Sequence, residues 1–321
     1  MKIVYAGTPD VAVPPLRFLA EAAGVEVVAV LTREDAPLGR KRVLTPSPVA
    51  AAADELGIPV LKASRWSEDL AQQIAGFGAQ AAAVVAYGAL LPQAALDLLP
   101  LGWVNLHFSA LPAWRGAAPV QRALMAGEQT IHANTFVLEA GLDTGPVFEQ
   151  DSTEVRADDT ADSILDRLAS EAGGAMLQRT FERLAAGESG TVQIEDDSVS
   201  YAAKMSIEDG KLDFAEHAQA IVARYRGVTS EPGAWCMYRE NRFKIGELAP
   251  VDPALAAELS LAPGTVSLHA KKVYVGTGAV DGIPGAVQLL RVQPAGKKMM
   301  AAADWARGTG KDLAEGAVVL V

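Results

Sequence analysis

Short apolar runs alternate with amphipathic stretches along the first half of the chain. The middle runs are apolar on both faces, as buried parallel strands are. The expected strands are residues 2–6, 25–32, 58–61, 81–87 and 103–108, and the expected helices between them are residues 10–22, 46–57 and 66–78. Strands and helices in alternation predict an α/β domain with a doubly wound, mostly parallel, Rossmann-like sheet.

The pattern changes in the second half. We expect two strands around a turn at residues 131–155, a long helix at 160–184 and a second helix at 214–227. A hairpin turning at Glu240-Asn241 follows at residues 233–250, then several short strands at 264–296 and a closing helix at 299–308. Short strands broken by Gly and Pro predict a small β-barrel that is similar to oligonucleotide-binding barrels. Periodicity is lost between the long helix and the second helix. We therefore expect domains at residues 1–189 and 206–321, joined by a linker at 190–205.

Length and composition fit this division. A chain of 321 residues exceeds what one hydrophobic core commonly supports, and half of its residues are hydrophobic, as in ordinary globular proteins. The N-terminus has no signal-peptide pattern and no run approaches the roughly 18 apolar residues of a membrane span, so we expect a cytoplasmic protein that does not bind membranes. Cys236 is the only cysteine and the four histidines are scattered, so we expect no metal site.

The net charge of −11 is unevenly distributed. Residues 205–321 hold 13 basic and 13 acidic residues, which leaves 15 bases and 26 acids in residues 1–204. Within this acidic part, Arg33, Arg40, Lys41 and Arg42 form a basic cluster after the second expected strand. A polyanion would meet such a loop through its phosphates. A solvated charged loop is the alternative.

The first strand-to-helix turn, "YAGTPD", tests for a dinucleotide site. Only Gly7 of a G-x-G-x-x-G fingerprint is present, and Thr32-Arg33 replace the acidic residue expected after the second strand. The sequence therefore disfavours a nicotinamide-dependent oxidoreductase.

The strongest candidate site lies in "VNLHFSALPAWRGAAPVQRAL", residues 104–124. Asn105 and His107 are two apart on an expected strand, so their side chains project to the same face. An amide and an imidazole side by side can hold a developing oxyanion and move a proton near neutral pH. The turn "GLDTG" offers Asp143 as an orienting carboxylate. Alternatively, each of the three could be a capping or core residue.

These segments resemble the signature of the folate-dependent formyltransferases. The resemblance extends over most of the chain, through "GTPDVAVPPL", "GRKRVLTPSPV", "VVAYGALLP", "YAAKMSIEDGKLDF", "EPGAW" and "LLRVQPAGKKMM". It implies that the catalytic residues are Asn105, His107 and Asp143. It implies that the folate-binding stretch is Ser109, Ala110, Leu111 and Pro112, and that the tRNA-binding loop contains Arg40, Lys41 and Arg42. It also implies that the C-terminal barrel binds the same tRNA.

The implied reaction transfers a formyl group from 10-formyltetrahydrofolate, a co-substrate and not a tightly bound cofactor, to the α-amine of initiator methionyl-tRNA. Because two domains would clamp one tRNA, we expect a monomer. Val11, Ala36 and Ala110 depart from the family pattern, in the first turn near the implied methionyl site, in the basic loop and in the folate-binding stretch. A formyltransferase acting on a sugar nucleotide or a ribonucleotide is the nearest alternative. A nucleotide-binding oxidoreductase and a non-catalytic RNA-binding protein are the others.

Overall fold

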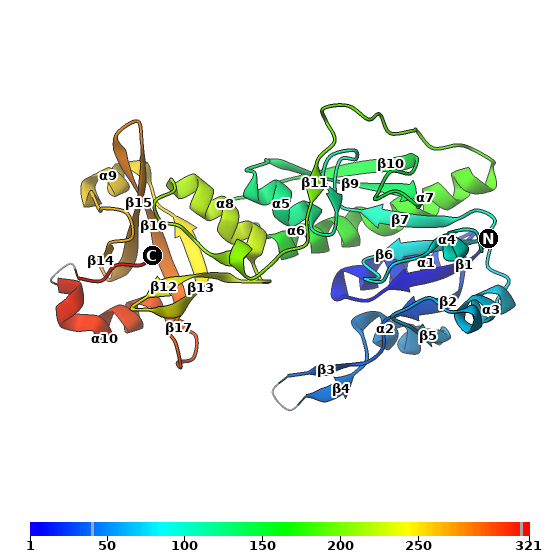
Figure 1. The fold of residues 1–321 in the computed structure, drawn as a ribbon, viewed down its shortest axis with the longest axis horizontal. Helices are drawn as coiled ribbons and strands as arrows, with labels where there is room; N and C mark the ends of the chain where they lie inside the picture. The colour runs from blue at the N-terminus through cyan, green and yellow to red at the C-terminus, as the bar shows by residue number, and fades with distance from the viewer. Residues whose placement is uncertain (40–41, 315–316) are drawn as a thin grey trace. The chain divides into compact units, whose positions relative to one another are not determined.

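The structure of the chain is a computed structural model that describes residues 1–39, 42–314 and 317–321. Its contacts divide it into two compact units (Figure 1). Unit 1 contains Met1–Pro119, Thr130–Val155 and Ser163–Ala202, and unit 2 contains Val120–Gln129, Arg156–Asp162 and Ala203–Val321.

A seven-stranded sheet forms the centre of unit 1, in the order β10-β9-β7-β6-β1-β2-β5. The strands are β1 (Lys2–Gly7), β2 (Glu26–Thr32), β5 (Val60–Lys62), β6 (Ala81–Val85), β7 (Trp103–His107), β9 (Thr130–Val137) and β10 (Val147–Glu154). The five strands expected in the first half are present and pair in parallel, whereas β9 and β10 add an antiparallel edge next to β7. The predicted parallel-dominated sheet is confirmed.

Helices cover both faces of this sheet. They are α1 (Val13–Glu21), α2 (Pro48–Leu56), α3 (Glu68–Gly76), α4 (Gln93–Leu96), α6 (Ala161–Leu168) and α7 (Gly174–Ala185), with a 3₁₀ turn at Asp10–Ala12 and a π-helical turn at Ala169–Gly173. Leu70 and Ile74 of α3 pack on Val4 and Ala6 of β1, while α1 packs against α2 and α7. The single long helix expected over 160–184 is thus α6 and α7 joined by the π-helical turn. None of the described helices is long and apolar enough to cross a bilayer.

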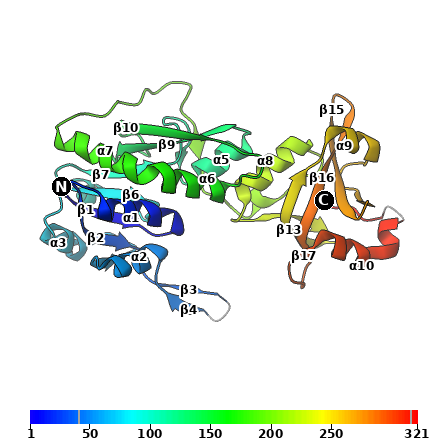
Figure 2. The same cartoon turned by 180° about the vertical axis from the view of Figure 1, so that it is seen from behind.

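Two short strand pairs of unit 1 were not predicted. β3 (Ala36–Leu38) and β4 (Val43–Thr45) form a hairpin that extends beyond the sheet (Figures 1 and 2). β8 (Arg115–Gly116) pairs in parallel with β11 (Tyr201–Ala202). The second pair brings the end of the stretch that we expected to be a linker against the segment that follows β7.

Unit 2 is a small antiparallel barrel. The strands β12 (Ala234–Tyr238), β13 (Asn241–Pro250), β14 (Val266–His269), β15 (Lys272–Val280), β16 (Ile283–Gln293) and β17 (Met300–Ala301) follow the order β12-β13-β16-β15-β14, with β17 on β16. The C-terminal residues close the sheet. Val321 exchanges backbone hydrogen bonds with Met237 of β12, while Val318 O accepts from Val266 N of β14 and Leu320 N donates to the carbonyl of Gly264, which precedes β14. The predicted barrel is therefore confirmed.

Helices complete unit 2: α5 (Pro119–Met125), α8 (Ala218–Val228), α9 (Pro253–Leu259) and α10 (Ala302–Ala314), with a 3₁₀ turn at Glu208–Gly210. α5 comes from the first half of the sequence, and its Arg122 donates to Asp209 Oδ1 at 2.7 Å. The β12–β13 hairpin turns at Arg239-Glu240, one residue before the expected position, because Asn241 pairs with Tyr238.

Candidate active site

The candidate catalytic side chains lie at the carboxyl end of β7, beside the antiparallel strand β9. Asn105 and His107 alternate along β7, so both project from the face that carries Trp103. The Asn105 side chain is partly exposed, whereas that of His107 is buried. In open α/β sheets this edge is the usual place for ligands. The structure thus places an amide and an imidazole on one face at the sheet edge where ligands bind in folds of this class.

His107 is held in one tautomer by a backbone carbonyl. Its Nε2 lies 3.1 Å from Trp114 O, and because a carbonyl only accepts hydrogen bonds, Nε2 carries the hydrogen. Burial lowers the pKa of His107, and the Asp143 carboxylate and the Trp114 carbonyl offset part of this effect. The imidazole is therefore neutral at neutral pH, with its hydrogen on the nitrogen that faces the carboxylate.

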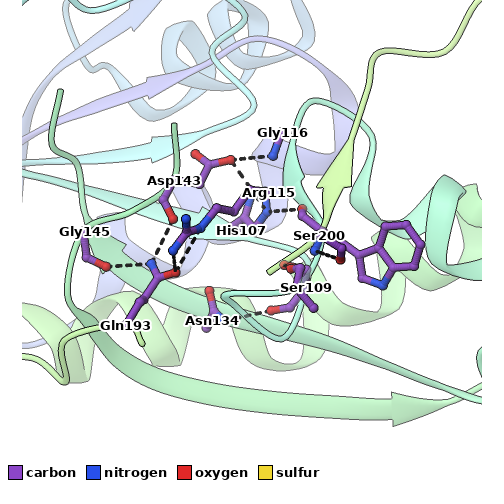
Figure 3. Close-up of polar contacts among 11 residues, drawn as sticks. His107, Ser109, Arg115, Gly116, Asn134, Asp143, Gly145, Gln193 and Ser200 are labelled. Atoms are coloured by element: carbon purple, nitrogen blue, oxygen red, sulfur yellow. Dashed lines mark hydrogen bonds and ion pairs between the residues drawn. The ribbon is translucent and has the colours of Figure 1, made fainter. Parts of the chain in front are cut away.

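Asp143 approaches this imidazole from the turn between β9 and β10 (Figure 3). Its Oδ2 lies 3.9 Å from His107 Nε2 and accepts a hydrogen bond of 2.7 Å from the backbone N–H of Gly116. Asp143 has a φ of 51°, in the left-handed region that is uncommon for residues with a side chain. The turn therefore needs outside contacts to hold the carboxylate in place.

The stretch expected to line the folate site follows β7 directly. Ser109 is buried and its hydroxyl donates to Ala113 O at 2.7 Å, which closes a turn around the half-buried residues Ala110, Leu111 and Pro112. On the neighbouring strand, Asn134 pairs with His107 and its Nδ2 donates to Ser109 O at 2.8 Å. Ser109 therefore shapes this loop from within, while the next three residues form its accessible part.

The basic loop expected to bind tRNA coincides with the β3–β4 hairpin. Arg40 and Lys41 lie outside the described residues. Arg42 is exposed and has a φ of 50°. Three apolar side chains of the hairpin are also exposed: Leu38, Val43 and Leu44. A nucleic acid that reached this hairpin would meet apolar surface as well as charge.

The sequence interpretation missed a third part of the site, residues 191–202. Within this segment, Gln193 and Ser200 bond the turns that carry Asp143 and Trp114 (Figure 3). Gln193 also accepts from the guanidinium of Arg115, which is 2% exposed. The only signal in the sequence was Arg115 itself, because a lone cation in an otherwise apolar stretch must find partners if it is buried.

An open hollow of about 860 Å³ borders the turn between β9 and β10. Glu139, Gly141 and Pro146 line it, but Asn105, His107 and Asp143 do not. Among the residues that the structure describes, no three His, Cys, Asp or Glu side chains are grouped so as to hold a metal ion. The catalytic candidates are thus defined by the contact of His107 with Asp143 and by the shared face of Asn105 and His107, and not by this hollow.

The chain matches sequence models of two protein domains. Residues 1–180 match "Formyl transferase", and residues 204–310 match "Formyl transferase, C-terminal domain". The first match alone covers more than half of the chain. The boundaries agree with the division at Ala203 that the contacts give.

Individual relatives narrow this assignment. The methionyl-tRNA formyltransferase of Arthrobacter sp. (strain FB24) is 54% identical over 308 residues, which are 96% of this chain and 97% of that protein. Among solved structures, WlaRD, a sugar 3N-formyl transferase in the presence of dTDP and 5-N-formyl-THF, superposes with a TM-score of 0.63 at 15% identity, over 93% of this chain and 99% of its own. Methionyl-tRNA formyltransferase from Clostridium thermocellum superposes with a TM-score of 0.56 at 15% identity, over 78% of this chain and 93% of its own.

The two kinds of likeness carry different weight. At 15% identity the solved structures show the fold alone, and that fold is shared by enzymes whose names give different acceptors. The identity of 54% over nearly the whole length of a relative is the stronger result. The chain therefore belongs to the formyl transferase family, and within it to the methionyl-tRNA formyltransferases.

Proposed function

We propose that this chain transfers the formyl group of 10-formyltetrahydrofolate to the α-amine of methionine esterified to initiator tRNA, which yields N-formylmethionyl-tRNA for translation initiation. The observation that carries the proposal is the meeting of His107 and Asp143 at the end of β7, with Asn105 on the same face. The names of the sequence relatives support the acceptor, and the WlaRD structure with a formylated folate supports the donor class.

The reaction needs an oxyanion site and two proton movements. The neutral α-amine attacks the formyl carbon, a C–N bond forms, and charge moves to the formyl oxygen. The amide of Asn105 donates to that oxyanion, and His107 joins it once the imidazole is protonated, because only then do both ring nitrogens donate. The attacking nitrogen then loses a proton and N10 of the folate gains one, after which the bond between the formyl carbon and N10 breaks and tetrahydrofolate leaves.

Asp143 has two tasks in this scheme. Its carboxylate favours the protonated form of His107 by charge, and with His107 it passes the proton, directly or through a water molecule. The Trp114 carbonyl fixes which nitrogen of His107 carries hydrogen in the resting enzyme. No covalent intermediate between enzyme and substrate is required.

Binding of the two substrates is assigned to separate parts of the chain. Ala110, Leu111 and Pro112, supported from within by Ser109, line the folate side. The β3–β4 hairpin with Arg40, Lys41 and Arg42 meets the acceptor arm of the tRNA, and the barrel of unit 2 binds the same RNA. Because the proposed acceptor takes part in translation, we place the enzyme in the cytoplasm, as a monomer that handles one tRNA at a time.

The test is a direct assay of the product. Purified protein is mixed with initiator methionyl-tRNA and 10-formyltetrahydrofolate, and N-formylmethionine released from the tRNA is measured by mass. A parallel reaction contains an amino-sugar nucleotide in place of the tRNA. Formylation of the tRNA alone supports the proposal, whereas formylation of the sugar nucleotide alone would overturn it.

A further inference from the structure

Residues 191–202 lie against both turns that hold the candidate catalytic pair. One turn carries Trp114 and Gly116, which supply a carbonyl to His107 and an N–H to Asp143. The other turn carries Asp143 itself. Figure 3 shows Gln193 between Arg115 and the turn of Asp143 and Gly145, and Ser200 beside Arg115. The segment is therefore placed to set the geometry of the pair without contacting the imidazole.

Gln193 uses its whole side-chain amide in this position. Its Nε2 donates to Asp143 O and to Gly145 O, both at 2.8 Å. Its Oε1 accepts from Arg115 Nη2 at 2.8 Å and from Arg115 Nε at 3.2 Å. A primary amide offers two donors and an oxygen with two lone pairs, so each is engaged.

Arg115 decides which way that amide points. A guanidinium can only donate hydrogen bonds, so it orients the oxygen of Gln193 towards itself and the nitrogen towards the Asp143 turn. The Arg115 side chain is 2% exposed, and its Nη1 also lies 2.8 Å from Glu195 Oε1. A charge buried this deeply is costly unless it is paired. The ion pair and the amide therefore form one fixed unit.

Ser200 holds the other turn. Its hydroxyl accepts from Trp114 N at 2.9 Å and its carbonyl accepts from Arg115 N at 2.8 Å. Gly116 fits closely against the same segment, since a Cβ on it would lie 2.7 Å from Ala202 O at a φ of 125°. The partners of His107 and of Asp143 are thus both fixed by residues 193–202.

We infer that Gln193, oriented by Arg115, is a positioning residue that holds the Asp143 carboxylate at its working distance from His107. The inference rests on the proposed catalytic roles of His107 and Asp143. Asp143 has a left-handed backbone conformation. The two hydrogen bonds from Gln193 are accepted by the backbone carbonyl of Asp143 and by that of Gly145, two residues later. Gln193 contacts the charged residues Arg115 and Asp143, and Arg115 forms an ion pair with Glu195.

The sharpest variant is Gln193→Glu. It keeps an oxygen for Arg115 but turns the second oxygen towards the carbonyls of Asp143 and Gly145, which repel it. Because a misplacement of about 1 Å can cost on the order of 100-fold in rate, we expect kcat to fall roughly 10- to 100-fold, with KM for methionyl-tRNA within about twofold of the wild type. Gln150→Glu makes the same chemical change on an exposed residue of β10 and should leave kcat unchanged.

Gln193→Ala is the second variant, because it removes the bonds without adding a charge. As Asp143 moves away from His107, the limb of the pH–rate profile that reports His107 should move to lower pH. Ile194→Ala, at a neighbouring side chain that is 71% exposed, should leave the profile unchanged. Thermal unfolding of each variant gives the fraction that is folded, by which kcat is corrected.

Two results would overturn the inference. One is a corrected kcat within twofold of the wild type in both Gln193 variants, and the other is a loss of kcat with no change in the pH profile of Gln193→Ala. Failure of the proposed catalytic roles gives a different pattern, in which His107→Ala and Asp143→Asn retain turnover.

Discussion

Asp143→Asn is the substitution that tests the candidate pair most directly. Asparagine has nearly the same size as aspartate and is tolerated in the left-handed conformation that Asp143 adopts. Its Oδ1 can take the hydrogen bond from Gly116 N, which is 2.7 Å long in the wild type. The turn should therefore keep its shape, so that the substitution removes the charge beside His107 and little else.

The size of the effect follows from the distance between the two groups. His107 Nε2 and Asp143 Oδ2 are 3.9 Å apart, and their side chains are 7% and 13% exposed. When His107 has taken up the proton during the reaction, the pair carries opposite unit charges, and with an effective dielectric constant of about 20 these attract by about 4 kcal/mol. The dipole of the asparagine side chain retains part of this attraction. Since each 1.36 kcal/mol is a factor of ten in rate, we expect turnover to fall roughly 100- to 1,000-fold.

Single-turnover formylation of methionyl-tRNA, with the product measured by mass, gives the rate of the chemical step. Affinity for tRNA should stay within about twofold, because Asp143 contributes no positive charge to RNA binding. Glu139→Gln removes an exposed carboxylate from the same turn and serves as the control. A rate for Asp143→Asn within threefold of the wild type would refute the assigned role, and so would a loss explained entirely by weaker tRNA binding.

The same charge also affects the pH dependence. Burial lowers the pKa of His107 and Asp143 raises it in part, so removing the carboxylate must lower that pKa further. The limb of the pH–rate profile that belongs to His107 should then shift to lower pH in Asp143→Asn. A shift to higher pH would show that another group controls that limb.

Three further predictions address other parts of the chain. Asn105→Ala removes one proposed oxyanion donor and should lower kcat roughly 100- to 1,000-fold without weakening tRNA binding, as measured by filter retention. Replacing Arg40, Lys41 and Arg42 by Ala should weaken tRNA binding and reduce the slope of log K against log salt by about 2, and an unchanged slope would place the contact elsewhere. In unit 2, the hydrogen bond from Arg122 lowers the pKa of Asp209 from 3.8 to about 2, so its stabilisation is present above pH 4 and is lost as the pH falls towards 2. Asp209→Asn should cost about 1 kcal/mol in urea unfolding at pH 7, and a cost that persisted at pH 2 would contradict this origin.

Much of the fold is encoded in local patterns. The five parallel strands of unit 1 were predictable because buried strands are continuous apolar runs between turns. The Asn105 and His107 pair was predictable for the same reason, since a period of two places alternate residues of one strand on one face. Asp143 needed the additional observation of two flanking glycines, and its distance from His107 could not come from the sequence.

Other features could not be predicted, because they depend on pairing between distant segments. Gln193 and Arg115 are 78 residues apart, and nothing local in "TVQIEDD" marks the glutamine as a buried partner. The β3–β4 hairpin was interpreted as a loop because its strands have only three residues each. α5 likewise belongs to unit 2 through contacts with segments far along the chain, and the hydrogen bond of Arg122 with Asp209 is one of them.

The contacts that define the candidate site are mostly made by backbone groups. Trp114 supplies a carbonyl and Gly116 an N–H, so the path of the chain, rather than either side chain, fixes the tautomer of His107 and the position of the Asp143 carboxylate. A backbone contact cannot be removed by an alanine substitution, and scanning this turn would underestimate its importance. Side chains that hold the backbone from behind, such as Gln193, are then the positions at which this geometry can be changed and its contribution to catalysis measured.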